Sequence, residues 1–268
     1  MNGKTVFALM SIAIIAVIVI GYVSTPADEN NDPEYGTIGI IGAMDVEVET
    51  LIQATDISEI RTVTGMDYYV GSMNGRDVVI VKCGMGKVNA GICTQMLITE
   101  FNVDCVINTG VAGSLDNRLN IEDMVISKDV VQHDFDVSPI GYQKGEIPYT
   151  GLYAFEANDH LIAMASKAIE ECAPEINYLE GRVCTGDQFI ATIEQKEKIV
   201  STFGGLCCEM EGGAIGQVCY LNDMPFVILR AVSDKADGSD TEDYSEFERK
   251  AAIRCASIVQ YMVSNMDW

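Results

Sequence analysis

Apolar and polar positions along the chain follow two periods, one typical of strands and one typical of helices. Short runs of mostly apolar residues predict strands within 37–41, 103–110, 123–134, 181–190 and 225–234. Stretches with apolar residues three to four positions apart predict helices within 44–55, 87–101, 157–173, 193–203 and 244–264. Two further strand-like runs flank Asn74-Gly75, a pair that favours a hairpin turn.

This alternation of strands with helices predicts an α/β fold. Several strands are apolar at nearly every position, which indicates a mostly parallel or mixed central sheet with helices on both faces. The chain has no internal repeat and no low-complexity tract. Its 268 residues are enough for one large domain, which we expect to span residues 37–268.

The N-terminal residues differ in composition from this domain. Residues 6–23 carry no charge and are long enough to span a bilayer. We therefore predict a signal anchor or transmembrane segment at 1–23, followed by an acidic linker at 24–36. Because the basic flank, Lys4, precedes the apolar run, the domain is expected on the extracytoplasmic side, anchored to the membrane. A cleaved signal ending near Ala27, which would release a secreted domain, is the alternative.

Composition narrows the partners and the chemistry. Forty acidic residues against 17 basic ones give a net charge of −23, which excludes nucleic acid as a partner because that binding depends on Lys and Arg. Only two histidines are present, without the spacing of metal ligands, so we expect neither a metal nor a cofactor. Residues 83–91 lack the spacing of a phosphate loop, and their glycines predict a strand-to-helix turn that packs closely on the sheet. The nine scattered cysteines leave the redox state open.

Polar side chains gather where predicted strands end. Glu47 follows the first strand, Asn108-Thr109-Gly110 ends a second, Asp187 follows a third and Ser233-Asp234 ends the last. In open α/β sheets, ligands bind outside the carboxyl ends of the strands, so these residues predict a site. Two carboxyl groups with separate tasks suit cleavage of a glycosidic bond, one as acid and one as base holding water. Asp187 is either part of this site or structural.

The segment CCEMEGGAIGQVC (207–219) holds two carboxylates in otherwise apolar surroundings. Carboxylates are rarely buried without a partner. Residues two apart face the same way only if the chain is extended, so a helix that starts between Glu209 and Glu211 would separate them. We expect Glu209 to support the helix N-terminus, which favours acidic groups.

At these residues the chain resembles the 5′-methylthioadenosine/S-adenosylhomocysteine nucleosidases of the purine nucleoside phosphorylase superfamily. The similarity runs in order over nearly all of 37–265, with matching spacing inside each motif. The motifs are IGIIGAMDVEV (38–48), KCGMGKVNAG (82–91), VINTGVAGSL (106–115), HDFDVSPIGYQKGEIP (133–148), TGDQFI (185–190), EMEGGAIGQVC (209–219) and FVILRAVSDKAD (226–237).

The resemblance implies two catalytic residues. Glu47 would hold and activate the water that attacks the anomeric carbon. Asp234 would protonate adenine N7 and, with backbone groups near Ile190, recognise the edge of the base. Water is therefore the implied co-substrate.

The resemblance also implies a set of substrate-binding residues. Phe189 would stack on adenine, Met210 would pack under the ribose, and Glu211 would accept hydrogen bonds from its hydroxyls. Arg230 and Ser233 would support this cluster.

Other implied residues concern the 5′ substituent and a second subunit. Met85 and Tyr244 would line the pocket for the 5′-thio group, and both differ from the commoner residues of the family. The segment from 140 to Pro148 would close over a neighbouring subunit's pocket, which implies a homodimer. Val111 stands where the family motif has a serine, so a hydroxyl near the water or sugar is absent.

The implied activity is hydrolysis of the N-glycosidic bond of 5′-methylthioadenosine, S-adenosylhomocysteine and related adenine nucleosides, releasing adenine and the thioribose product. A phosphorylase of the same superfamily is an alternative. However, the loop after the first strand offers Asp45, Glu47 and Glu49 and no arginine for phosphate. Another purine nucleosidase, such as a futalosine hydrolase, is a closer alternative. A non-catalytic, membrane-anchored nucleoside-binding protein is the alternative from another class.

Overall fold

A computed structural model describes residues 36–238 and 244–266 of the chain. The predicted signal anchor at 1–23 lies outside the described residues. So does the predicted linker at 24–36, except for Gly36. The described residues belong to one compact unit, a single α/β domain with a mixed sheet and flanking helices, which confirms the predicted fold class at this level.

The sheet is built around parallel strands, with antiparallel pairing at the β2–β3–β4 edge and between β10 and β6, β5 and β9, and β6 and β7. β1 pairs in parallel with β4 and β5, and β5 pairs in parallel with β10. β10 also pairs with β6, β6 with β8, β8 with β9, and β9 back with β5, so these five strands close on themselves. The strands are β1 (Ile38–Gly42), β2 (Asp56–Val63), β3 (Met66–Met73), β4 (Arg76–Lys82), β5 (Cys105–Ser114), β6 (Met124–Gln132), β7 (Phe155–Glu156), β8 (Tyr178–Thr185), β9 (Cys207–Glu209) and β10 (Phe226–Asp234).

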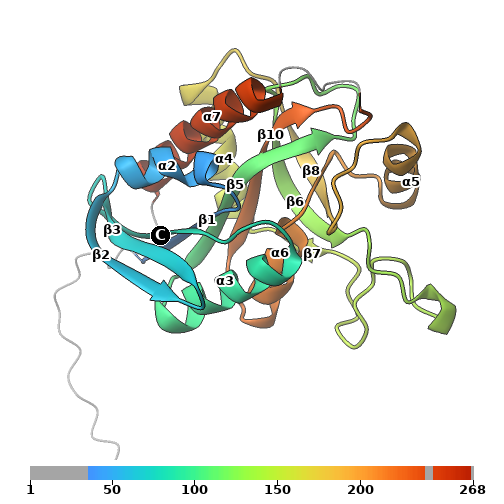
Figure 1. The fold of residues 1–268 in the computed structure, drawn as a ribbon, viewed down its shortest axis with the longest axis horizontal. Coiled ribbons are helices and arrows are strands. Elements are labelled where there is room, and N and C mark those ends of the chain that lie inside the picture. The colour runs from blue at the N-terminus through green and yellow to red at the C-terminus, as the bar shows by residue number, and fades with distance from the viewer. Residues whose placement is uncertain (1–35, 239–243, 267–268) are drawn as a thin grey trace, which may run out of the picture. The chain divides into compact units, whose positions relative to one another are not determined.

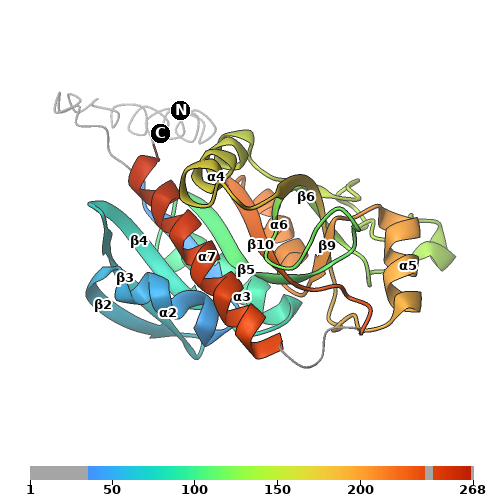
Figure 2. The same ribbon diagram turned by 90° about the horizontal axis from the view of Figure 1, so that it is seen from above.

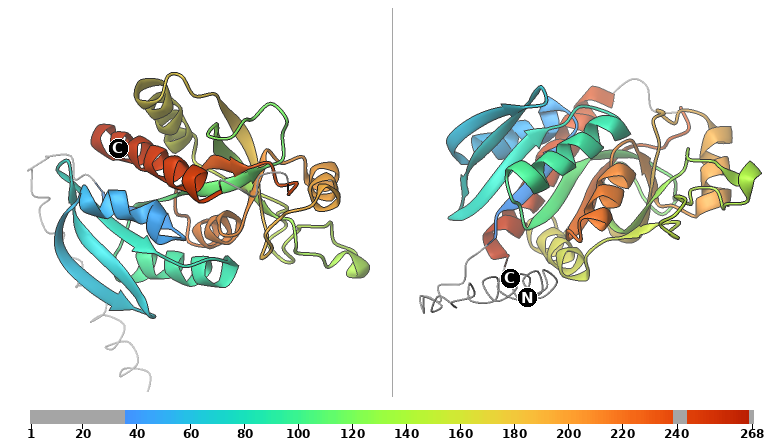
Figure 3. Two further views of the ribbon diagram at one scale, coloured as in Figure 1. Left: turned by 45° about the horizontal axis from the view of Figure 1, so that its top comes forward. Right: turned by 90° about the horizontal axis from the view of Figure 1, so that it is seen from below.

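Helices cover both faces of the sheet. On one face α7 packs beside α2 and α4, and on the other α3 packs beside α6 (Figures 2 and 3). α5 follows β8 and lies away from the other helices, on the right of Figure 1. The helices are α2 (Asp45–Gln53), α3 (Lys87–Glu100), the short η1 (Ser138–Ile140), α4 (Asp159–Cys172), α5 (Ile193–Phe203), α6 (Gly212–Leu221) and α7 (Tyr244–Asn265).

Local sequence signals explain several element ends. The Asn158 side chain accepts a hydrogen bond from the Leu161 N–H at 3.1 Å and caps α4. Thr192 caps α5 in the same way, and α5 ends at Gly204, whose positive φ of 68° suits glycine. Asn74 and Gly75 both have positive φ and join β3 to β4, so the predicted hairpin is confirmed.

Several strands differ from the sequence prediction, among them β2 and β5. β2 was not predicted because most of its residues are exposed, so its sequence DISEIRTV lacks a buried apolar run. It pairs with β3 at the antiparallel edge of the sheet. β5 continues past Gly110 to Ser114, because the small residues there remain buried and pair with β10 and β9.

The predicted location on the extracytoplasmic side of a membrane is wrong. Among residues 36–238 and 244–266, no helix is long and apolar enough to cross a bilayer. The longest of these helices, α7, carries several charged residues, including Glu246, Arg249 and Arg254. The apolar run at 6–23, on which the prediction rested, lies outside the described residues.

Candidate active site

One pocket lies where the carboxyl ends of β1, β5 and β10 meet. These strands are parallel neighbours, so the residues that follow each of them come to the same edge of the sheet. The segment 207–211 closes another side. The lining residues are Ala43, Met44, Glu47, Met85, Val111, Ala112, Gly113, Gln188, Phe189, Ile190, Cys208, Glu209, Met210, Glu211, Ser233 and Asp234.

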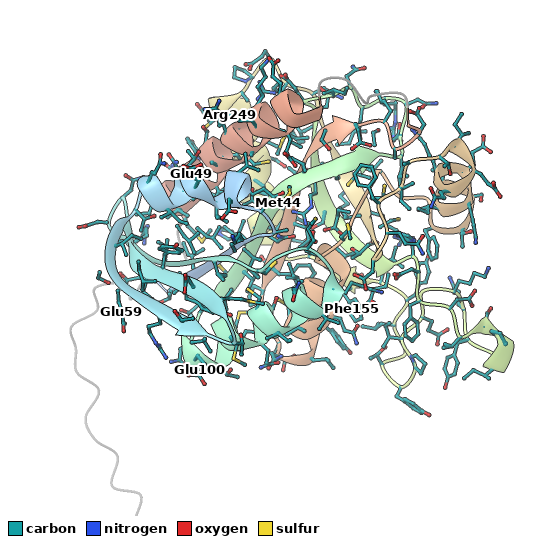
Figure 4. The ribbon with its side chains drawn as sticks, in the orientation of Figure 1. Met44, Glu49, Glu59, Glu100, Phe155 and Arg249 are labelled. Carbon is teal, nitrogen blue, oxygen red and sulfur yellow. The ribbon has the colours of Figure 1, made fainter. Side chains whose placement is uncertain are left out.

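Glu47 lies buried in the first turn of α2 and accepts three backbone hydrogen bonds. Its Oε2 accepts the N–H of Ala43 at 2.6 Å and that of Met44 at 3.0 Å, and its Oε1 accepts the N–H of Val111 at 3.1 Å. Met44 is labelled at the start of α2 in Figure 4. Burial raises the pKa of Glu47, although the Arg230 charge and the three N–H groups act in the opposite direction. A carboxylate held in this way suits proton transfer closer to neutral pH.

Arg230 on β10 is fully buried beneath the pocket and is held by acidic and amide groups. Its Nη2 donates to Asn108 Oδ1 at 2.6 Å and to Glu209 Oε2, and lies 3.6 Å from Glu211 Oε2. A buried guanidinium requires such partners, since charges are costly to remove from water. Arg230 therefore fixes the two carboxylates of the 207–219 segment on one side of the pocket.

Glu209 and Glu211 have different tasks. Glu209 Oε2 accepts the backbone N–H groups of Glu211 at 3.1 Å and Gly212 at 2.7 Å, so it supports the start of α6 as expected. Glu211 lines the pocket, and its Oε1 accepts the Gly86 N–H at 2.8 Å. Burial and the neighbouring Glu209 charge raise the pKa of Glu211 to about 7.

Asp234 ends β10 and is oriented by its neighbours. Its Oδ2 accepts the Ser233 hydroxyl at 2.9 Å, and its Oδ1 accepts the Ala236 N–H at 2.7 Å. The Ser233 hydroxyl also reaches the Ala112 carbonyl at 3.4 Å, which ties this end of β10 to β5. These contacts fix Asp234 in the wall of the pocket, which Glu211 also lines.

Apolar side chains complete the lining. Ile190 is buried, whereas Phe189 and Met85 are each 62% exposed and lie where the pocket opens to solvent. Met210 and Val111 are partly buried. The pocket thus combines fixed carboxylates with a largely apolar wall, a combination typical of small-molecule sites.

Comparison with known proteins places the chain in a family. Residues 37–264 match the phosphorylase superfamily. A 5′-methylthioadenosine/S-adenosylhomocysteine nucleosidase of Staphylococcus aureus (strain JH9) is 42% identical over 231 residues, covering 85% of this chain and 100% of the relative. The chain belongs to the 5′-methylthioadenosine/S-adenosylhomocysteine nucleosidase family. This confirms the resemblance inferred from the motifs.

Solved structures agree with this assignment. The nucleosidase of Neisseria meningitidis, in complex with methylthio-immucillin-A, has a TM-score of 0.83 at 35% identity, covering 86% of this chain and 100% of that one. The enzyme of Colwellia psychrerythraea 34H, in complex with adenine, has a TM-score of 0.82 at 37% identity, covering 86% and 95%. A futalosine hydrolase of Helicobacter pylori has a TM-score of 0.81 at 31% identity, covering 86% and 98%.

The comparisons give the predicted membrane anchor no support. The Staphylococcus aureus nucleosidase matches over its full length and still leaves 15% of this chain uncovered. The superfamily match begins at residue 37, after the predicted anchor and linker. The superfamily match thus covers nearly all of the residues that the structure describes.

Most residues that the nucleosidase motifs assigned lie together. Nine of the predicted residues line the pocket, and the buried Arg230 contacts two of the lining carboxylates, Glu209 and Glu211. Pro148 is partly buried in the projecting segment after η1 and is not among the lining residues. Tyr244 begins α7, but the structure does not describe its side chain. The nine lining residues are Glu47, Met85, Val111, Phe189, Ile190, Met210, Glu211, Ser233 and Asp234.

Several lining residues were not predicted. Met44, Gly113, Gln188 and Cys208 lie one to three positions from predicted residues, at the same strand ends, so adjacency was the available signal. In the parts of the chain that the structure describes, no group of three or more His, Cys, Asp or Glu side chains is arranged to hold a metal ion.

Proposed function

We propose that the protein hydrolyses the N-glycosidic bond of 5′-methylthioadenosine, S-adenosylhomocysteine and related adenine nucleosides. The products are adenine and the corresponding thioribose. The Staphylococcus aureus relative is a 5′-methylthioadenosine/S-adenosylhomocysteine nucleosidase, and the similar structure from Colwellia psychrerythraea is a complex with adenine. We assign the activity to the domain predicted at 37–268.

The observation that carries the proposal is the set of donors around Glu47. The backbone N–H groups of Ala43, Met44 and Val111 all point at its carboxylate. Phosphorolysis needs cationic and N–H donors for a phosphate ion, and here these three N–H groups are occupied by a carboxylate of the chain itself. The buried cation nearby, Arg230, is held by Glu209 and Asn108. Water, not phosphate, is therefore the nucleophile that this site favours.

The proposed reaction uses two carboxyl groups of the pocket, those of Glu47 and Asp234. Glu47 holds a water molecule and takes its proton as the water oxygen bonds to the anomeric carbon. The bond from that carbon to the base nitrogen breaks, and its electron pair moves into the purine ring. Asp234 donates a proton to N7, so that adenine leaves as a neutral molecule.

The remaining residues hold the nucleoside. Phe189 stacks on adenine, and backbone groups near Ile190 meet the edge of the base. Glu211 accepts hydrogen bonds from the ribose hydroxyls, with Met210 packed beneath the sugar. Arg230 and Ser233 hold Glu211 and Asp234 in place, as their contacts indicate.

Two parts of the proposal concern the 5′ end of the substrate and a second subunit. Met85 and Val111 give an apolar wall suited to a thioether, and Tyr244 and the partner's segment around Pro148 would complete it. Pairing with a second copy of the chain is supported by large apolar side chains that are exposed on α3 and in residues 138–149, which include η1. These are Val88 (72% exposed), Ile92 (41%), Ile140 (73%) and Tyr149 (99%).

Adenine release by the full-length chain tests the proposal. We expect release from 5′-methylthioadenosine and S-adenosylhomocysteine, and a loss of at least about 100-fold in Glu47→Gln. The matched control is Glu49→Gln, on the exposed side of the same helix and labelled in Figure 4, which should release adenine at the wild-type rate. Equal rates in Glu47→Gln and wild type would contradict the role of Glu47.

A futalosine hydrolase is the second candidate, because such an enzyme shares 31% identity and the fold over 86% of this chain. Base release from futalosine in parallel with the thioribosides separates the two. Faster release from futalosine would replace the proposed substrates, and binding of nucleosides without any release would favour a non-catalytic protein.

A further inference from the structure

Three polar contacts form a closed ring beside the pocket. The backbone N–H of Lys87 donates to Asp187 Oδ1 at 2.8 Å, and the N–H of Asp187 donates to Asp134 Oδ2 at 2.8 Å. The Lys87 ammonium then donates to Asp134 Oδ1 at 2.5 Å and closes the ring. The ring joins the start of α3, the residues after β6 and the loop after β8, which are far apart in sequence.

The two ends of this ring touch different halves of the pocket. Gly86, directly before Lys87, donates its N–H to Glu211 Oε1, on the side proposed for the ribose. Phe189 and Ile190, on the side proposed for the base, follow Asp187 by two and three residues. The turn and the loop are in close contact, since a Cβ on Gly86 would lie 3.2 Å from Asp187 Oδ1.

A second chain of contacts leads from Lys87 to the helix that follows Glu211. The Lys87 ammonium also donates to Gln132 Oε1 at 3.3 Å, and the Gln132 amide donates to Gln217 Oε1 on α6 at 2.6 Å. Glu211 is the residue directly before α6. Lys87 is therefore linked to Glu211 in two ways, through its backbone neighbour Gly86 and through the side chains of Gln132 and Gln217 to the helix that Glu211 precedes.

The burial of the ring members differs in an informative way. The Lys87 and Asp134 side chains are each 17% exposed, so they form a partly buried ion pair. Asp187 is exposed, and an exposed carboxylate contributes little to global stability. Its two hydrogen bonds instead fix the loop that carries Phe189 relative to the turn that carries Gly86.

We propose that Asp187, with Lys87 and Asp134, is a positioning residue that couples the ribose half of the pocket to the base half. Ordering of Glu211 by the sugar then orders the Phe189–Ile190 loop for the base, and the reverse. This inference rests on the proposed function, since it uses adenine and the thioribose as the two ligands. Coupling of this kind is reciprocal: each ligand strengthens the binding of the other by the same factor.

Calorimetric binding of adenine to the full-length chain, with and without saturating 5-methylthioribose, measures the coupling. In the wild type we expect adenine to bind at least about fivefold more tightly when the sugar is present. In Asp187→Ala the factor should fall below about twofold, and Lys87→Met, which breaks the ring from its other side, should have the same effect. The double variant should lose no more than either single one, because both act on one ring.

The control is Glu194→Ala, an exposed carboxylate in the first turn of α5, which should keep the wild-type factor. If Asp187→Ala weakens adenine binding but keeps the coupling factor, its role is local and the proposal is wrong. A wild-type chain that binds neither adenine nor methylthioribose would instead overturn the proposed function, and this inference with it. The two failures are thus distinguishable.

Discussion

At the scale of single residues, the pocket separates its carboxyl groups by environment. Glu47 accepts three backbone N–H groups, Glu209 is paired with Arg230, and Asp234 is held by a hydroxyl and one N–H. Glu211 lies beside the Glu209 charge with its pKa raised to about 7. Carboxyl groups in such different surroundings can take separate roles within one site.

The raised pKa of Glu211 predicts a pH-dependent effect on stability. Between its ordinary pKa of 4.5 and about 7, the folded chain keeps a proton on Glu211 that the unfolded chain loses. The contribution of this group to the free energy of unfolding therefore falls as pH rises through that window. Glu211→Gln stays neutral, so it should be more stable than wild type at pH 8, by roughly 3 kcal/mol, with little gain near pH 4.5. Urea unfolding at both pH values measures this, and a gain independent of pH would contradict it.

The buried ion pair predicts a large loss of stability in Arg230→Met. Removing the guanidinium leaves Glu209 buried without its cation and Asn108 Oδ1 without its donor. The expected cost is about 3–5 kcal/mol of unfolding free energy, measured by urea denaturation. Arg249→Met, on the exposed surface of α7 and labelled in Figure 4, is the control and should change stability by less than about 0.5 kcal/mol. Equal effects of the two substitutions would refute the structural role of Arg230.

The roles of single residues could be predicted from the sequence more readily than their contacts with distant residues. Glu209 could be expected to support a helix start because it precedes the apolar and glycine-rich run of α6. Its pairing with Arg230 could not, because the two lie 21 positions apart on strands that are not direct neighbours. The ring of Lys87, Asp134 and Asp187 was also missed, since nothing in a linear pattern relates a helix start to two distant loops.

At the scale of elements, side chains that lie against β5 restrict which residues the strand can hold. A Cβ on Gly110 would lie 2.5 Å from Glu47 Oε1 and 2.9 Å from Arg230 Nη1. Glycine at this position therefore lets both side chains reach over the strand. The close approach is between a backbone and two fixed polar groups, so neither can easily move away.

Gly110→Ala should therefore displace Glu47 and lower kcat/KM for adenine release by at least about 100-fold, because small shifts of a catalytic group are costly. The control is Gly91→Ala on α3, where the nearest atom to a new Cβ, on Val218, is at an ordinary contact distance of 3.8 Å. Alanine also favours the helix, so this variant should keep full activity. Wild-type activity in Gly110→Ala would show that Glu47 is not fixed as described.

Elements with a strong apolar period were predictable, and weakly patterned ones were not. β1 and β10 are buried at every position, and the hairpin carries its own turn residues. β2 is an exposed edge strand, and β9 has only three residues, so neither leaves a periodic signal. β2 is fixed by pairing with β3, the next strand, and β9 is fixed by pairing with β5 and β8, which lie earlier in the chain.

At the scale of the whole molecule, net charge and exposed apolar surface have opposite effects on the association of two copies of the chain. With a net charge of −23, two copies of the chain repel at long range, and salt screens this repulsion. A homodimer must therefore depend on apolar contact, for which the exposed Val88 and Ile140 are the candidates.

Val88→Glu should therefore convert the proposed dimer into a monomer and raise KM for the thioribosides, as measured by sedimentation and by adenine release. Ile60→Glu, which changes a residue 56% exposed on β2, is the matched control and should leave the dimer intact. Raising the salt concentration should favour the wild-type dimer. A wild-type chain that stays monomeric at all salt concentrations would contradict the proposed assembly.

The central claim is that Glu47 directs water, not phosphate, to the anomeric carbon. Its most direct test is product analysis after turnover of 5′-methylthioadenosine by the full-length chain in ¹⁸O-labelled water with phosphate in excess. We expect adenine and 5-methylthioribose labelled with ¹⁸O at the anomeric hydroxyl, at a rate that phosphate does not change. An unlabelled sugar 1-phosphate would contradict it and would mean that the donors around Glu47 accept phosphate after all.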